Sequence, residues 1–196
     1  MDMRRWIAIG VALIGSLVGS ATASAAYWTG WISEEAPVNQ GWCNAWNEAA
    51  VGMACSGSYC DSIRLRCEVL PNSMYLDSNT DYWTDYFSEE FDDLWVDDGG
   101  WYHGYWDNNR LCGYHSPYLV SGIRCSGSYC DNMSLECDLP KRSDGSLSTF
   151  SNCSWTQWFS DETGTNGVWY RSKYVVGVGC GGSYCDNVMF EACTLS

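Results

Sequence analysis

The segment GMACSGSYCDSIRLRC, residues 52–67, determines the architecture of this chain because related copies of it occur twice more. The other copies are GIRCSGSYCDNMSLEC at 122–137 and GVGCGGSYCDNVMFEAC at 177–193. A second motif precedes each copy, as WTGWISEE at 28–35, WTDYFSEE at 83–90 and WTQWFSDE at 155–162. Two motifs that recur in the same order indicate tandem repeats. We place repeat 1 at residues 26–76, repeat 2 at 77–143 and repeat 3 at 144–196, within one domain.

Each Cys-rich segment has the pattern of a β-hairpin. In repeat 1, apolar residues alternate with other types along 51–55 and again along 63–67, which predicts two half-buried strands. The intervening SGSYCD is composed of turn-forming residues. The aromatic and β-branched WT motif predicts a third strand. No segment shows sustained helical periodicity, so we expect an all-β fold, with the three repeats stacked as a pseudo-threefold β-prism or β-trefoil.

The even number of cysteines predicts disulfides, with four in each repeat. They are Cys43, Cys55, Cys60 and Cys67; Cys112, Cys125, Cys130 and Cys137; and Cys153, Cys180, Cys185 and Cys193. Four cysteines allow three pairings, but a hairpin brings Cys55 close to Cys60, which favours a nested pattern with Cys43 bonded to Cys67. Repeat 3 departs from this spacing, because Cys153 precedes its WT motif and Cys193 lies one residue further along. A β-bulge would restore the inward orientation of Cys193.

Residues 1–25 have the pattern of a signal peptide, with Arg4 and Arg5, an apolar stretch and an A-x-A cleavage site at 23–25. We therefore expect a secreted protein in the extracellular space or a periplasm, where disulfides persist. No other segment has 18 consecutive apolar residues, so no transmembrane span is expected. The chain carries a formal charge of −14, and −15 without this segment, because the segment contains two of the 10 basic and one of the 24 acidic side chains. Such acidity disfavours binding to nucleic acid and to anionic membranes.

The cysteine spacing and the recurring GSYCDN resemble the three-repeat, cysteine-rich β-prism modules at the C-termini of perforin-like (MACPF-type) proteins. This resemblance covers most of the chain after residue 25. It implies a recognition module that attaches to a cell or egg surface. The pore-forming domain that accompanies those modules has no counterpart in this sequence, so the resemblance does not imply pore formation.

Repeat 2 contains an insertion, FDDLWVDDGGWYHGYWD at residues 91–107, that the other repeats lack. Aromatic rings beside carboxylates suit a sugar, whose apolar face stacks while its hydroxyl groups donate to the acids. Loops on a rigid scaffold often carry function. The candidate ligand-binding residues are Trp95, Asp97, Asp98, Trp101, Tyr102 and Trp106. The alternatives are a lid packed against the sheets, or a contact with protein or zwitterionic membrane.

The recurring aromatic and acidic residues have a simpler structural interpretation. Aromatic residues that repeat at equivalent places are expected to fill the same packing role three times, rather than to form three ligand sites. Calcium binding by the recurring acids is not favoured, because a spaced Asp-x-Asp-x-Asp loop is absent and turn capping accounts for them. The acids concerned are Glu35, Glu90, Glu162, Asp61, Asp131 and Asp186.

No catalytic or cofactor motif occurs, so we expect neither an enzyme nor a cofactor. The leading hypothesis is a secreted, disulfide-rich module that binds glycans or a cell-surface ligand through the aromatic and acidic loop. The alternative is a structural or coat protein without a small ligand. A third hypothesis is a glycosidase, in which Glu90 and either Asp97 or Asp98 would supply the two carboxylates that glycoside hydrolysis requires.

Overall fold

The computed structural model describes residues 25–35, 37–88, 109–113, 117–162 and 166–196. In this part of the chain no helix exceeds a three-residue 3-10 turn, which confirms the all-β prediction. The expected signal peptide and the insertion 91–107 lie outside the described residues. The strands are β1 (Tyr27–Trp28), β2 (Gln40–Trp42), β3 (Glu48–Ser56), β4 (Ser62–Val69), β5 (Tyr75–Trp83), β6 (Asn109–Leu111), β7 (Leu119–Ser126), β8 (Asn132–Lys141), β9 (Phe150–Trp155), β10 (Gly167–Trp169), β11 (Tyr174–Gly181) and β12 (Asn187–Leu195). None of the described helices is long and apolar enough to cross a bilayer.

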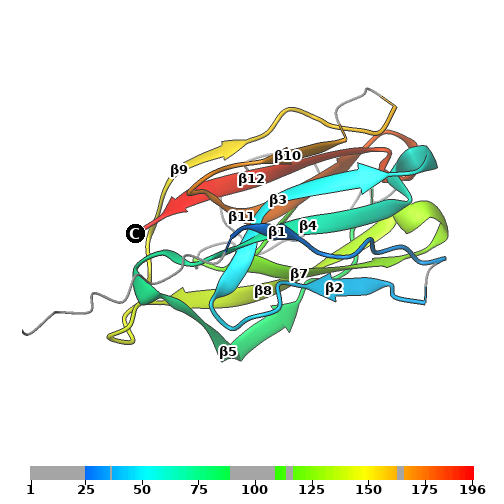
Figure 1. Ribbon diagram of the computed structural model, residues 1–196. Helices are drawn as coiled ribbons and strands as arrows, with labels where there is room; N and C mark the ends of the chain where they lie inside the picture. Colours follow the sequence, from blue (N-terminus) through cyan, green and yellow to red (C-terminus); the bar gives the residue numbers. More distant parts are fainter. Residues whose placement is uncertain (1–24, 36, 89–108, 114–116, 163–165) are drawn as a thin grey trace, which may run out of the picture.

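The strands form three antiparallel, four-stranded sheets (Figure 1). Sheet A has the order β1-β4-β3-β10, sheet B β2-β7-β8-β5 and sheet C β6-β11-β12-β9. The two central strands of each sheet are the predicted hairpin of one repeat, namely β3–β4, β7–β8 or β11–β12. On one edge of each sheet lies a strand that ends at the tryptophan of the WT motif of the same repeat and pairs with the second hairpin strand. The motif was expected to form this strand itself, but beyond its tryptophan it contributes only an isolated bridge at Ile32, Phe87 or Phe159.

The other edge of each sheet comes from a different repeat. Repeat 1 donates β2 to the hairpin of repeat 2, and repeat 2 donates β6 to the hairpin of repeat 3. Repeat 3 in turn donates β10 to the hairpin of repeat 1, so the exchange closes on itself. A single repeat therefore supplies only three strands of its own sheet, as expected for repeats that cannot fold alone.

The hairpin turns are three-residue 3-10 turns with the same backbone in every repeat: η1 (Ser58–Cys60), η3 (Ser128–Cys130) and η4 (Ser183–Cys185). The central tyrosine of each turn is left-handed, with φ between 60° and 64°. Gly57 precedes the first turn with φ 83°, and a Cβ there would overlap the Asp61 carboxylate. The tyrosines Tyr59, Tyr129 and Tyr184 lie in mutual edge-to-face contact, with ring centroids 5.7–5.9 Å apart.

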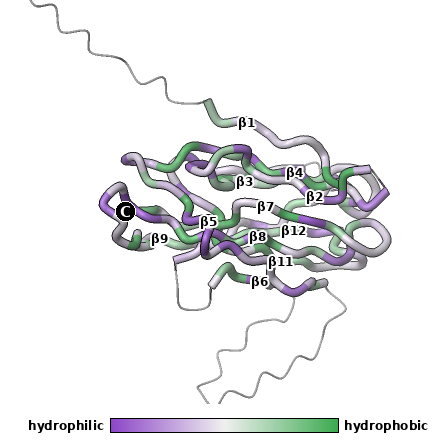
Figure 2. The backbone as a smooth tube through the Cα atoms, turned by 90° about the horizontal axis from the view of Figure 1, so that it is seen from below, coloured by the Kyte–Doolittle hydropathy of each residue, from purple (hydrophilic) through white to green (hydrophobic). Residues whose placement is uncertain are grey.

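The prediction of half-buried strands is correct for the second strand of the first hairpin and wrong for its first strand. β4 alternates between buried and partly exposed residues. β3, by contrast, is buried along its length to Cys55, as β7 and β11 nearly are. The reason is that β3, β7 and β11 face one another in the middle of the molecule, where one core cluster extends across all three hairpins and a second one lies near their open ends. Figure 2 shows hydrophobic stretches on β3 and β7, and on other strands such as β6 and β12 as well.

The nested disulfide pattern is confirmed. Cys43 bonds to Cys67 and Cys55 to Cys60, and repeat 2 repeats this with Cys112–Cys137 and Cys125–Cys130. In repeat 3 the short-range bond Cys180–Cys185 is kept, while Cys193 bonds to the displaced Cys153. The bulge expected to restore the inward orientation of Cys193 is not found in β12, because Ala192 stands opposite Val175 as Cys67 stands opposite Ala50, and Cys193 lies one residue further along. Ala192 shares the core cluster of Cys67, while Cys193 belongs to the second cluster. The register against β9 does shift between Ala192 and Thr194, but there the additional residue belongs to β9.

Tyr170 occupies the position of the cysteine that repeat 3 lacks. Cys43, Cys112 and Tyr170 each follow the donated strand directly, and their backbone N–H groups donate to the hairpin of the recipient repeat at 2.8, 2.7 and 2.9 Å. The Tyr170 ring packs edge-on against Phe190, with centroids 6.0 Å apart. Aromatic packing therefore replaces a disulfide at this position, and the covalent bond moves to β9.

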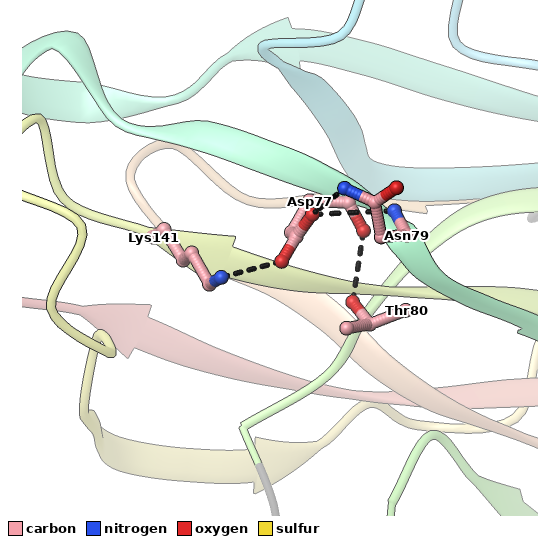
Figure 3. A network of polar contacts seen from close by, with 4 residues as sticks. All are labelled: Asp77, Asn79, Thr80 and Lys141. Carbon is pink, nitrogen blue, oxygen red and sulfur yellow. Dashed lines mark hydrogen bonds and ion pairs between the residues drawn. The ribbon is translucent and has the colours of Figure 1, made fainter.

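A local polar network fixes an irregular part of β5, where the pairing with β8 is interrupted between Asp77 and Tyr82 (Figure 3). Lys141 forms an ion pair with Asp77 at 2.5 Å. The backbone N–H and side-chain amide of Asn79 both donate to the same carboxylate, at 3.2 and 3.0 Å, and the Thr80 hydroxyl donates to the Asp77 carbonyl at 2.8 Å. These bonds satisfy backbone groups that the sheet leaves unpaired.

Candidate functional site

The ligand-binding residues predicted from the sequence are not tested by the structure. Trp95, Asp97, Asp98, Trp101, Tyr102 and Trp106 all lie outside the described residues, as does Glu90. The segment that contains them follows β5 in sheet B and precedes β6 in sheet C. The candidate site described below is therefore built from other residues.

The WT motif fastens an edge strand to the hairpin in every repeat. Its threonine hydroxyl accepts a hydrogen bond from a backbone N–H of the second hairpin strand, at 3.0 Å for Thr29 and Thr84 and 3.1 Å for Thr156. The backbone N–H of the same threonine donates back at 2.9 Å. The fifth residue of the motif, which is Ile32 in repeat 1, is buried in the core. These positions have the packing role expected from their repetition.

The aromatic residue three positions after the first tryptophan differs, because it is exposed in all three repeats. Trp31 is 40% exposed, Tyr86 37% and Trp158 47%. An indole left this accessible forgoes a large hydrophobic stabilisation, since burying an aromatic side chain removes about 150–250 Å² from water. These side chains are therefore the first members of a candidate binding surface.

An open groove lies between the segments 27–32 and 38–44, where repeat 1 passes from sheet A to sheet B. Its volume is about 310 Å³, at the lower end of the range for small-molecule sites. Trp28, Trp31 and Trp42 supply its aromatic walls, and Gln40 and Asn44 its amide groups. We call it the aromatic groove. Its full lining is Tyr27, Trp28, Thr29, Gly30, Trp31, Ile32, Val38, Gln40, Gly41, Trp42 and Asn44.

One end of the aromatic groove is fixed to β3 by Tyr27. The Tyr27 hydroxyl donates to Glu48 Oε2 at 2.6 Å and accepts a hydrogen bond from the backbone N–H of Asn44 at 2.7 Å. Burial, followed by the bond to Glu48, raises the pKa of Tyr27. The phenol therefore stays protonated at neutral pH and can hold both segments of the groove in place.

The same four positions lie opposite one another in each sheet and form a cross-strand row. Each row contains the tryptophan of the WT motif, a charged residue, the first glycine of the Cys-rich motif and a large residue of the donated strand. Directly opposed residues share a face of the sheet. Row A is Trp28, Arg66, Gly52 and Trp169; row B is Trp83, Glu136, Gly122 and Trp42; row C is Trp155, Glu191, Gly177 and Leu111.

The row glycine makes room for the donated strand. A Cβ at Gly122 would lie 2.6 Å from Trp42 Cδ1 and 2.6 Å from Glu136 Oε2, and one at Gly52 would overlap Trp169. The bare backbone therefore lets the side chains on either side meet above it. As a result, the Trp28 and Trp169 rings lie 6.0 Å apart and the Trp42 and Trp83 rings 6.4 Å apart, both nearly perpendicular.

Row A extends into a stacked ladder of three indoles and two guanidinium groups, which we call the stacked ladder: Trp31, Arg64, Trp28, Arg66 and Trp169. The Arg64 guanidinium carbon lies 4.2 Å from the Trp31 ring centroid and 4.6 Å from that of Trp28. Arg66 lies 5.6 Å from Trp28 and 4.7 Å from Trp169. Contacts at these distances are attractive cation–π interactions, and they hold the rings in place. Trp28 and Trp31 belong both to the ladder and to the groove.

Row B has a different charge balance. Arg124 stacks on Trp83 and Tyr86 at 4.4 and 4.9 Å, but the row position itself holds Glu136. Burial, reinforced by Asp138 and Asp81, raises the pKa of Glu136 from 4.5 to about 7. Its Oε2 atom is buried without a hydrogen-bond partner among the described residues. Row B therefore combines indoles with an acid whose charged form is disfavoured.

Row C lacks both the stacked arginine and the second tryptophan. Its charged residue, Glu191, also has a raised pKa because it is partly buried. Leu111 stands where Trp42 and Trp169 stand in the other rows. Among the described residues, only rows A and B thus offer paired indoles, and only in row A is the charged residue of the row an arginine.

Five of the six acids considered for calcium binding lie in the described residues, where local turn contacts involve them. Asp61, Asp131 and Asp186 follow the hairpin turns, where their carboxylates lie against the preceding glycines. The backbone N–H groups of Glu35 and Glu162 donate to the serines two residues earlier, at 3.3 and 3.1 Å. No group of three or more potential metal ligands occurs within the part of the chain described above.

Sequence reasoning missed Trp42 and Trp169, which belong to no repeated motif. The sequence signal for them is their neighbour: Trp42 directly precedes Cys43, and Trp169 directly precedes Tyr170, which takes the corresponding position in repeat 3.

Comparison with known protein families, with curated proteins and with solved structures found no match to this chain.

Proposed function

We propose that this protein is a secreted glycan-binding module, in which the aromatic groove holds a sugar. The observation that carries the proposal is the pair of exposed indoles at the groove, with Trp31 40% and Trp42 41% exposed. A pyranose presents an apolar C–H face that stacks on an indole, and its hydroxyl groups can bond to the amides of Gln40 and Asn44. Six disulfides support the assignment to an oxidising compartment.

Preorganisation of the groove supports the same proposal. Trp28 is held between two arginines, and Tyr27 is bonded to both Glu48 and Asn44. A ligand that binds to rings already held in place loses less conformational entropy than one that must order them. The aromatic groove therefore suits binding without rearrangement of these side chains.

We further propose that the three sheets form a pseudo-threefold β-prism, as the resemblance to cysteine-rich prism modules implies. The equivalent hairpins, the cyclic exchange of edge strands and the cluster of Tyr59, Tyr129 and Tyr184 support this arrangement.

The aromatic and acidic loop at 91–107 remains a second proposed contact for the same ligand. A purely structural or coat function is the competing proposal, and the density of disulfides is the observation that favours it.

A glycan array with the wild-type protein and three single variants tests the proposal. Trp42→Ala removes one groove wall, Trp101→Ala tests the loop, and Trp46→Ala is the matched control. Trp46 is 68% exposed and packs on Tyr75 outside the groove, with ring centroids 6.1 Å apart. We expect glycan binding that Trp42→Ala weakens by about tenfold or more, as for the loss of a central aromatic contact, and that Trp46→Ala leaves unchanged.

Two results would contradict this function. If the wild type binds no glycan and its folded state resists heat and protease until the disulfides are reduced, the structural function is favoured instead. If Trp42→Ala and Trp46→Ala bind as the wild type does, the aromatic groove is not the site. Loss of binding in Trp101→Ala alone would assign the ligand to the loop.

A further inference from the structure

We propose that the stacked ladder beside the aromatic groove recognises an oxyanion, a carboxylate or sulfate group, on the glycan; this inference rests on the proposed glycan-binding function. The first observation is that its two arginines form no ion pair with any acid among the described residues. Although the chain has 24 acidic residues, no carboxylate in its described part lies within 4.0 Å of Arg64 or Arg66. Glu68, two residues beyond Arg66 on β4, forms no ion pair with it.

The second observation is how the guanidinium groups are presented. Indole rings cover their faces: Trp28 and Trp31 contact Arg64, and Trp28 and Trp169 contact Arg66. Arg64 Nε is buried without a hydrogen-bond partner among the described residues, while the side chain as a whole remains partly exposed. The terminal N–H groups are therefore the donors that a ligand can reach, and such a pair of parallel donors matches a carboxylate or sulfate.

The third observation is the difference between row A and row B. Arg124 in sheet B is stacked in a similar way, but Glu136 lies close enough for the two charges to interact. In row A the corresponding position is occupied by Arg66 itself, so two positive charges lie next to each other without an intervening acid. Row A therefore has a second arginine at the position where row B has an acid.

Trp28 and Trp31 connect this surface to the groove. A sugar ring that occupies the groove lies against the same indoles that stack on Arg64. A negatively charged substituent on that ring, or on the next residue of the polymer, can then reach the ladder. The predicted ligand class is therefore an acidic polysaccharide, with a neutral ring in the groove and an oxyanion on the arginines.

Three polymers with one backbone test the inference: dextran, carboxymethyl-dextran and dextran sulfate. We expect the full-length secreted chain to bind one or both charged polymers about tenfold or more tightly than dextran, because hydrogen bonds from a guanidinium group to an oxyanion are charge-assisted. Which of the two binds more tightly identifies the oxyanion. Arg66→Gln and Arg64→Gln should abolish the preference, Arg124→Gln should keep it, and Trp42→Ala should weaken binding to all three polymers.

Inorganic sulfate provides a test that needs no variant. Added sulfate should displace dextran sulfate from the wild type at concentrations where the same ionic strength of chloride does not. Equal binding of the three polymers, or an unchanged preference in Arg64→Gln and Arg66→Gln, would overturn the inference, while sensitivity of dextran binding to Trp42→Ala would leave the glycan-binding function intact. If the wild type binds none of the three, the inference fails, and the glycan array alone decides the proposed function.

Discussion

Glu136→Gln should stabilise the protein at alkaline pH and leave its stability at acidic pH almost unchanged. Glu136 is partly buried between the Trp42 and Trp83 indoles, near Asp138 and Asp81, and its pKa is raised from 4.5 to about 7. An acid whose pKa is raised by folding prefers to be protonated in the folded state. Its favourable contribution is therefore complete below about pH 4.5 and is lost as the pH rises through about 7.

The magnitude follows from the size of the shift. A change of this size in an isolated group corresponds to about 3 kcal/mol, since one pKa unit is about 1.4 kcal/mol. Because Glu136 remains partly exposed, solvent screening reduces the effect, and we expect about 1–2 kcal/mol. The amide of glutamine has nearly the same shape, and its carbonyl oxygen can still accept a hydrogen bond from Trp42, so the variant removes the charge without removing the packing.

Denaturant unfolding with intact disulfides, at pH 4.5 and pH 8.5, measures the effect. The variant should exceed the wild type by about 1–2 kcal/mol in free energy of unfolding at pH 8.5, and by much less at pH 4.5. Glu35→Gln, which removes an exposed carboxylate, is the control and should show no such difference. A gap between Glu136→Gln and wild type that is the same at both pH values would refute the reasoning, because a group that titrates between them must make the gap depend on pH.

Three further perturbations test the architecture. Gly52→Ala should destabilise the protein by roughly 1–3 kcal/mol in denaturant unfolding, because its Cβ would overlap Trp169 on the donated strand, whereas Gly30→Ala, with no atom within 4 Å, should cost much less. Removal of the Cys43–Cys67 disulfide by a double serine variant should cost about 2–4 kcal/mol in the same assay, and an unchanged midpoint would mean that this bond does not constrain the fold. Thr84→Val should cost about 1–3 kcal/mol, since Thr84 is buried and its hydroxyl accepts the Leu135 N–H at 3.0 Å; stability equal to that of the wild type would show that water replaces this bond.

Local patterns in the sequence were sufficient to predict the hairpins and the nested disulfides. Each depends on residues close together in the chain, such as Cys55 and Cys60 across one turn. The exchange of edge strands could not be predicted in this way, because β2, β6 and β10 are three residues long and lack a shared motif. Their positions follow from contacts with hairpins of other repeats.

The same limit applies to the candidate site. The repeated motifs pointed to Trp28, Trp31 and their counterparts, but the sequence suggested only packing roles for them. Arg64 and Arg66 stood out merely as the polar half of an alternating strand. Their importance arises from the sheet register, which places Arg66 opposite Trp28 and, across Gly52, near Trp169. A single sequence does not contain that register, since it depends on a strand more than 100 residues away.

If the protein is secreted, as we propose, the cyclic exchange of strands also determines when it can finish folding during export. A chain that leaves the cell N-terminus first presents β3 long before β10, the strand that completes sheet A, has crossed the membrane. The disulfides within repeats 1 and 2 can form in that interval, because each joins cysteines at most 25 positions apart. The free edge of β3 cannot be covered until the last repeat arrives, and an uncovered edge strand readily pairs with other chains. Translocation that stalls before residue 167 should therefore yield an intermediate that is already cross-linked, yet prone to aggregate.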